Sequence, residues 1–176
     1  TPKISINQQG TIDITSQDMT GGATVWNYPY TVINATSSTY IDGTATVSLS
    51  TVADAAGNNA GSPTGTTFTI DTTPPNLTIT TDPTSPSNNN GSLVYTFEFS
   101  ENVTGFDAAD ITLNFTGAGA AGIDGSIFAT TDANTYNLTL AGQDLTALGS
   151  LTTGQTVVLS VNMSGLTDIA TNPGVG

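Results

Sequence analysis

Residues 93–99 of the chain, Leu-Val-Tyr-Thr-Phe-Glu-Phe, decide its fold class. The leucine and the three aromatic residues occupy every second position, so an extended strand would place them on one face and the glutamate on the other. Shorter stretches with the same alternation recur along the chain, at residues 4–6, 12–14, 45–49, 68–70, 77–79, 111–115, 138–140 and 157–161. Only residues 107–112 and 142–149 could hold a helical turn. The pattern predicts an all-β protein made of antiparallel β-sandwiches.

The composition excludes several classes of function. The 176 residues include 14 acidic side chains, one basic side chain (Lys3) and no histidine or cysteine, and the formal net charge is −13. Catalysis by a Ser-His-Asp or Cys-His arrangement and a conventional zinc site are therefore excluded, and no basic patch can bind nucleic acid or anionic lipid. No apolar stretch approaches the roughly 20 residues that span a bilayer. Carboxylate chemistry, hard cations bound through oxygen, and a structural role remain.

A proline-containing stretch, Asp-Thr-Thr-Pro-Pro at residues 71–75, predicts a short, stiff linker between two domains, residues 1–71 and 72–176. An internal repeat supports this division. Shifted by 114 positions, residues 47–58 align with residues 161–172, and both copies run from a strand into an Asp-x-Ala-x-Asn sequence. The sequence therefore predicts two related units in tandem.

The second copy of the repeat lacks the strand that follows the first, at residues 65–70. We therefore expect the second sandwich to lack its closing strand and to present an unpaired sheet edge. Residues 10–15, Gly-Thr-Ile-Asp-Ile-Thr, share the pattern of residues 65–70. One hypothesis is that the N-terminal strand of one subunit fills the open edge of the next, which joins copies head-to-tail by donor-strand complementation. The alternative is that this sequence is a slice of a longer array of repeats, in which the next residues supply the missing strand.

Several short motifs together resemble the tandem bacterial Ig-like repeats of large surface adhesins. They are Asp-Gly-Thr-Ala-Thr-Val at residues 42–47, Asp-Ala-Ala-Gly-Asn at 54–58 and Thr-Phe-Thr-Ile-Asp-Thr-Thr-Pro-Pro at 67–75. Phe-Ser-Glu-Asn-Val-Thr-Gly-Phe at 99–106 is similar to the early part of a related bacterial Ig-like repeat, and the resemblance covers most of residues 40–176. It implies two Ig-like units in an extracellular, cell-surface protein without enzyme activity, which serves as a subunit or spacer of a filament or adhesin.

The same resemblance implies Ca²⁺ at domain junctions, where the ion stiffens the linker. Ca²⁺ takes roughly six to eight oxygen ligands, and this acidic chain is rich in carboxylates and amides. The candidate ligands are Asp54, Asn58 and Asp71 near the first junction, and Glu101, Asp107, Asp110, Asp168 and Asn172 in the second domain. The alternative is that Asp54 and Asp168 only accept backbone N–H bonds in Asx-turns, which need no metal.

Two covalent or catalytic possibilities are disfavoured. Glu98 and Glu101 are the only glutamates, and nothing in the sequence places them as the acid and base of a glycosidase. Lys3 could form an isopeptide bond with an asparagine if it were buried. In an extended strand it would lie on the face opposite Ile4 and Ile6, however, so we expect it to be exposed.

The aromatic residues near the N-terminus suggest an alternative function. Trp26, Tyr28 and Tyr30 occupy every second position and, with Tyr40, could line a sugar-binding face. A strand that faces the core gives the same alternation, and we favour core packing. The alternative function is a ligand-binding adhesin module that recognises a host or surface glycan.

Overall fold

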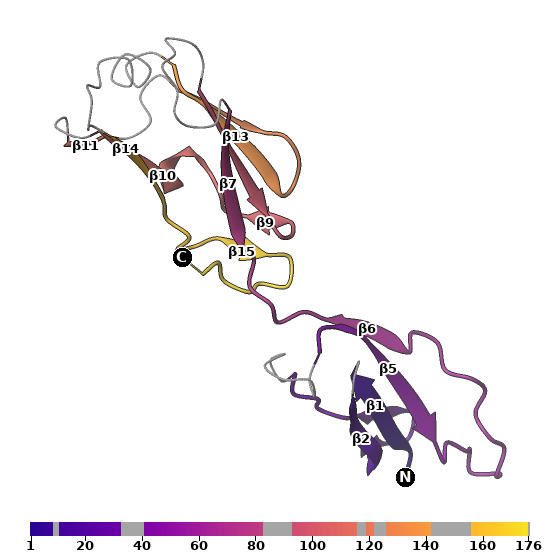
Figure 1. Ribbon diagram of the computed structural model, residues 1–176. Helices are drawn as coiled ribbons and strands as arrows, with labels where there is room; N and C mark the ends of the chain where they lie inside the picture. The colour runs from indigo at the N-terminus through magenta and orange to yellow at the C-terminus, as the bar shows by residue number, and fades with distance from the viewer. Residues whose placement is uncertain are drawn as a thin grey trace. The chain divides into compact units, whose positions relative to one another are not determined.

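The computed structural model describes residues 1–8, 11–32, 41–82, 93–115, 119–121, 126–141 and 156–175. Regular structure in these residues is almost entirely β-strand, with one short 3₁₀ helix, η1 (Ala108–Asp110), inside the first predicted helical turn. The second predicted turn, 142–149, lies outside the described residues. The chain divides into two compact units, Thr1–Thr73 and Pro74–Gly176 (Figure 1). The predicted all-β class is confirmed.

The first unit is built around one antiparallel sheet with the strand order β2-β1-β5-β6. Its strands are β1 (Lys3–Gln8), β2 (Thr11–Asp18), β5 (Gly43–Ser50) and β6 (Thr67–Ile70). A small hairpin of β3 (Thr20–Gly22) and β4 (Val25–Asn27) lies between them in the chain. The four sheet strands contain the predicted alternating stretches. In β1 the alternation is complete, because Ile4, Ile6 and Gln8 are buried and the residues between them are not.

The described core of the first unit is small. Its buried apolar side chains are Ile4, Ile6, Ala45 and Ile70. Gln8 is also buried, and its side-chain oxygen accepts a hydrogen bond of 3.0 Å from the Tyr30 hydroxyl. The Tyr30 ring in turn packs edge-to-face on Phe68, with 6.0 Å between ring centroids. Tyr30 therefore joins the sheet core to its partly exposed edge.

The second unit contains two sheets that face each other across a core. One has the order β12-β13-β8-β7 and the other β11-β10-β14. The strands of the first sheet are β7 (Leu77–Asp82), β8 (Val94–Phe99), β12 (Ile127–Thr130) and β13 (Thr135–Thr139). Those of the second are β10 (Ile111–Phe115), β11 (Gly119–Ala121) and β14 (Val157–Val161), and a short pair is formed by β9 (Val103–Thr104) and β15 (Thr167–Asp168). All of these strand pairs are antiparallel.

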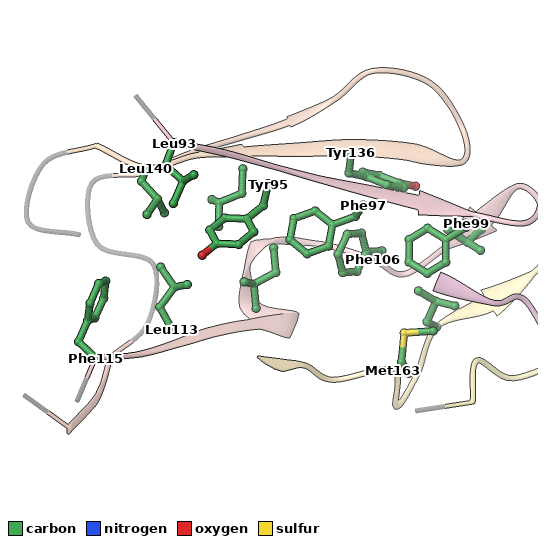
Figure 2. Close-up of a cluster of buried hydrophobic side chains, with 14 residues drawn as sticks. Leu93, Tyr95, Phe97, Phe99, Phe106, Leu113, Phe115, Tyr136, Leu140 and Met163 are labelled. Carbon is green, nitrogen blue, oxygen red and sulfur yellow. The ribbon is translucent and has the colours of Figure 1, made fainter. Parts of the chain in front are cut away.

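Aromatic side chains fill the core of the second unit. Tyr95, Phe97 and Phe99 point inward from β8, as their alternation predicts, while Glu98 is exposed on the outer face. Phe106 lies at the centre, with its ring centroid 5.4 Å from that of Phe97 and 5.1 Å from that of Phe99 (Figure 2). Buried side chains from β10 and β13 complete the cluster, so the core is shared between both sheets.

Candidate functional site

The Asp-x-Ala-x-Asn sequence of the first unit folds into a turn held by its aspartate. Asp54 Oδ1 accepts hydrogen bonds from the backbone N–H of Ala56 (2.9 Å) and of Asn58 (2.8 Å), and its Oδ2 accepts one from the Asn58 side-chain amide (2.8 Å). The turn is exposed. The hydrogen bonds from Asn58 lower the pKa of Asp54, because they favour the ionised carboxylate.

The second copy makes the same two hydrogen bonds between its aspartate and its asparagine. Asp168 Oδ1 accepts from the backbone N–H of Asn172 and Oδ2 from the Asn172 side-chain amide, both at 2.8 Å. The likeness extends to the flanking chain: the Ala60 N–H donates to the Val52 carbonyl and the Gly174 N–H to the Leu166 carbonyl, both at 2.9 Å. An isolated β-bridge closes each turn at equivalent positions. The repeat found in the sequence is therefore a repeat in hydrogen bonding, and both aspartates act as turn caps.

The two turns differ in their surroundings. Asp168 is only 2% exposed, because its strand β15 pairs with β9 and places it opposite Val103. Glu101 lies two residues before Val103, and one of its carboxylate oxygens lies within 4.8 Å of one of Asp168. Two carboxylates at this distance repel each other unless a cation or a proton lies between them. The turn in the second unit thus combines a buried carboxylate with a neighbouring one.

The neighbouring carboxylates of Asp168 and Glu101 could together hold a Ca²⁺ ion. Each carboxylate has about four acceptor positions, and the hydrogen bonds from Asn172 occupy one on each oxygen of Asp168. Positions remain for a hard cation, which prefers oxygen ligands. Capping and ion binding are therefore compatible at Asp168.

The other predicted ligands are engaged locally. Asp107 Oδ1 accepts from the Ala109 N–H (2.7 Å) and Asp110 Oδ2 from the Asp107 N–H (2.9 Å), a reciprocal capping box around η1. In the first unit, Asp71 Oδ1 accepts from the Thr73 N–H at 3.2 Å. Asp107 and Asp110 thus serve the local turn in the structure.

Asp42 is an anchor that the sequence did not single out. Its Oδ1 accepts from the Thr72 N–H (3.0 Å) and hydroxyl (2.9 Å), and its Oδ2 from the Thr73 hydroxyl (2.5 Å). Burial alone would raise the pKa of Asp42, but the bonds from Thr73 and Thr72 outweigh it and hold the pKa below its usual value. Asp42 directly precedes β5 and Thr72 follows β6, so the carboxylate ties the end of one strand to the start of its neighbour.

Lys3 and the N-terminal aromatic residues are partly buried. Lys3 is partly exposed rather than buried, and its Nζ lies 2.8 Å from Asp18 Oδ1 and also donates to the Ser16 carbonyl. Trp26, Tyr28 and Tyr30 are half-buried while their immediate neighbours are exposed. The alternation is therefore that of a sheet-facing segment. Tyr40 lies outside the described residues.

A two-sheet antiparallel sandwich with an aromatic core and aspartate-capped turns defines an Ig-like β-sandwich module. The family model for the bacterial Ig-like domain matches residues 71–176, and the chain belongs to this family. Domains of this family are typically structural or binding modules and are common in surface proteins. The comparisons with curated proteins and with solved structures gave no match. No helix in the described part of the chain is long and apolar enough to cross a membrane.

Proposed function

We propose that the chain is a load-bearing spacer of tandem Ig-like units in an extracellular surface filament or adhesin stalk. The observation that carries the proposal is the path of the chain through the first unit. Lys3 at the start of β1 pairs with Ser50, and Ile70 at the end of β6 pairs with Gly43. Ser50 and Gly43 are the two ends of β5. The chain therefore enters at one end of the central strand and leaves at the other.

This geometry suits a tether. The eight residues of β5 separate the entry and exit points by about 24 Å at the rise of an antiparallel strand. Because β1 and β6 both run antiparallel to β5, tension on the two ends shears the ladders along their length. All of their hydrogen bonds then carry load together. The Asp42 bonds to Thr72 and Thr73 secure the exit end.

The shared turn supports the tandem part of the proposal. The two hydrogen bonds from Asn58 to Asp54 match those from Asn172 to Asp168, as expected if both units derive from one Ig-like module. Bacterial Ig-like domains are common at cell surfaces, where arrays of modules span distance. The proposal includes a Ca²⁺ ion bound by the carboxylates of Asp168 and Glu101.

Single-molecule force spectroscopy tests the load-bearing role. The chain has no cysteine, so pairs of introduced cysteines give unique handles. Handles at Thr1→Cys and Asn76→Cys apply force along the strands. Handles at Thr1→Cys and Ser50→Cys pull on adjacent ends of β1 and β5 and break the ladder bonds one at a time. We expect a markedly higher unfolding force with the first pair, and equal forces would contradict the proposal.

A further inference from the structure

The edge of β14 in the second unit is the counterpart of a paired edge in the first. By the repeat, β14 corresponds to the first five residues of β5. β10 pairs with β14 through Ile111 and Val161, as β1 pairs with β5 through Ile6 and Val47. On its other side β5 pairs with β6, whereas among the described residues β14 pairs with β10 alone (Figure 1). The position that β6 takes in the first unit is thus held by no strand in the described part of the second unit.

Within its own five residues, β14 lacks the charges, prolines and bulges by which proteins protect exposed edges. Its sequence, Val-Val-Leu-Ser-Val, has no charge and no proline, and its register with β10 is unbroken over five residue pairs. Val158 is 54% exposed. The outer strand of the first unit, β2, shows the opposite: its register with β1 is interrupted twice, and it carries the Lys3–Asp18 ion pair. Charges and bulges block edge-to-edge pairing, so β14 is suited to accept a strand.

The repeat also tells which backbone groups of β14 face the open side. In the first unit the Val47 N–H points away from β1 and donates to the Thr66 carbonyl at 2.6 Å. Groups on one side of an antiparallel strand belong to alternate residues. Val47 and every second residue before it in β5 correspond to Val161, Leu159 and Val157 of β14. Their N–H and C=O groups are the ones available to an added strand.

We propose that the β14 edge binds an extended strand of the β6 type, Thr-apolar-Thr-Ile-Asp, supplied by a further Ig-like repeat. The strand runs antiparallel to β14, with the position of Phe68 opposite Leu159 and that of Ile70 opposite Val157. Main-chain hydrogen bonds supply affinity and inward apolar side chains supply specificity. Ile70 shows the expected burial, being 3% exposed in the first unit.

The N-terminal strand is a less suitable occupant. β1 pairs with β2 on one side and with β5 on the other, so donating either N-terminal strand to a neighbour would break an existing ladder. A strand of the β6 type, by contrast, already occupies the equivalent position in the first unit, where it pairs with β5. The inference depends on the equivalence of the two units and goes beyond the spacer role, which the force measurement tests separately.

A peptide with the sequence of residues 64–73, labelled with fluorescein, tests the inference against the full chain by fluorescence anisotropy. We expect saturable binding. N-methylation of the Phe68 amide removes a donor that faces the partner strand and should weaken binding roughly tenfold or more. The matched control is N-methylation at Thr69, whose amide faces away, and its binding should be unchanged.

Amide hydrogen exchange locates the bound peptide. Exchange at Leu159 and Val161 should slow when the peptide binds, whereas Val158 and Ser160, whose amides face β10, should not change. The proposal is overturned by three results: no saturable binding, equal loss of affinity from both methylated peptides, or tighter binding of a peptide with the sequence of residues 10–17. The last result would assign the edge to the N-terminal strand.

Discussion

Asp168 holds Asn172 through two hydrogen bonds of 2.8 Å, one from the backbone N–H and one from the side-chain amide. Asp54 and Asn58 form the same pair of bonds in the first unit. Asp168 is buried and Asn172 half-buried, whereas Asp54 and Asn58 are both exposed. One chain therefore contains the same turn in two environments, and each turn serves as a control for the other.

Replacing the buried aspartate should be the more damaging change. Asp168→Ala removes a buried carboxylate and the two hydrogen bonds that it accepts from the half-buried Asn172, and we expect a loss of about 2 kcal/mol in the free energy of unfolding. Asp54→Ala exposes the same amides to water and should cost less. Calorimetric unfolding measures both variants, and the fluorescence of Trp26, the only tryptophan, identifies the transition of the first unit. Equal losses would show that burial does not matter.

Phe106 should be the most sensitive aromatic position. Its ring packs edge-to-face on those of Phe97, Phe99, Phe128 and Tyr136, at centroid distances of 5.0 to 5.6 Å. Phe106→Ala removes all four contacts and should cost about 3–5 kcal/mol, which would lower the melting temperature of the second unit. Phe106→Leu keeps most of the volume and should cost less. The Trp26 transition of the first unit provides the internal reference and should stay in place.

The strands were predictable from the sequence because their burial is periodic. Tyr95, Phe97 and Phe99 alternate on β8, and the same period of two marked β1, β5, β10 and β14. The β3–β4 hairpin was not predicted as such, because its strands are only three residues long and mostly exposed, and neither is long enough to show a period by itself. An alternation of apolar residues can be recognised in a sequence only when the strand is long enough and is buried on one face.

The candidate site was only partly predictable. The repeat identified Asp54 and Asp168 as equivalent, and both turned out to be caps. Sequence spacing could not reveal that only Asp168 is buried or that Glu101 lies beside it, because both facts come from the pairing of β9 with β15. Asp42 was missed for the same reason, since its partners Thr72 and Thr73 lie 30 and 31 residues away.

The first unit should lose stability in acid through Asp42 and Asp54. The folded-state pKa of each lies below the ordinary value of 3.8. For a depressed pKa the stabilising contribution is present above the unfolded-state pKa and is lost as the pH falls through the folded-state pKa. The melting temperature followed by Trp26 fluorescence should therefore be nearly constant from pH 7 to about pH 4 and decrease below it. Asp42→Asn and Asp54→Asn should each flatten that fall, and an unchanged profile would contradict the assignment.

Calcium should stabilise the second unit if the ion binds where we propose. Ligand binding to the folded state raises stability by about 2.7 kcal/mol at a concentration 100-fold above Kd. We expect Ca²⁺ to raise the melting temperature of the second unit and a chelator to reverse the rise. Glu101→Gln should abolish the effect while keeping the side-chain shape. Asp54→Asn is the control that should retain it, and Asp71→Asn tests the ligand that the sequence predicts at the end of the first unit.

Comparing alanine substitutions at Gly105 and Gly165 measures how much one close backbone contact contributes to stability. Both have left-handed backbones, with φ of +90° and +93°. A Cβ at Gly105 would lie 2.9 Å from the Gly165 carbonyl oxygen, whereas a Cβ at Gly165 meets nothing within 4 Å. Gly165→Ala should therefore cost only the conformational strain, about 1–2 kcal/mol, and Gly105→Ala should cost more because backbone must also move. Urea unfolding of the two variants measures the difference. If their midpoints fell by the same amount, conformational strain alone would explain both and the β9–β15 region would be looser than its contacts indicate.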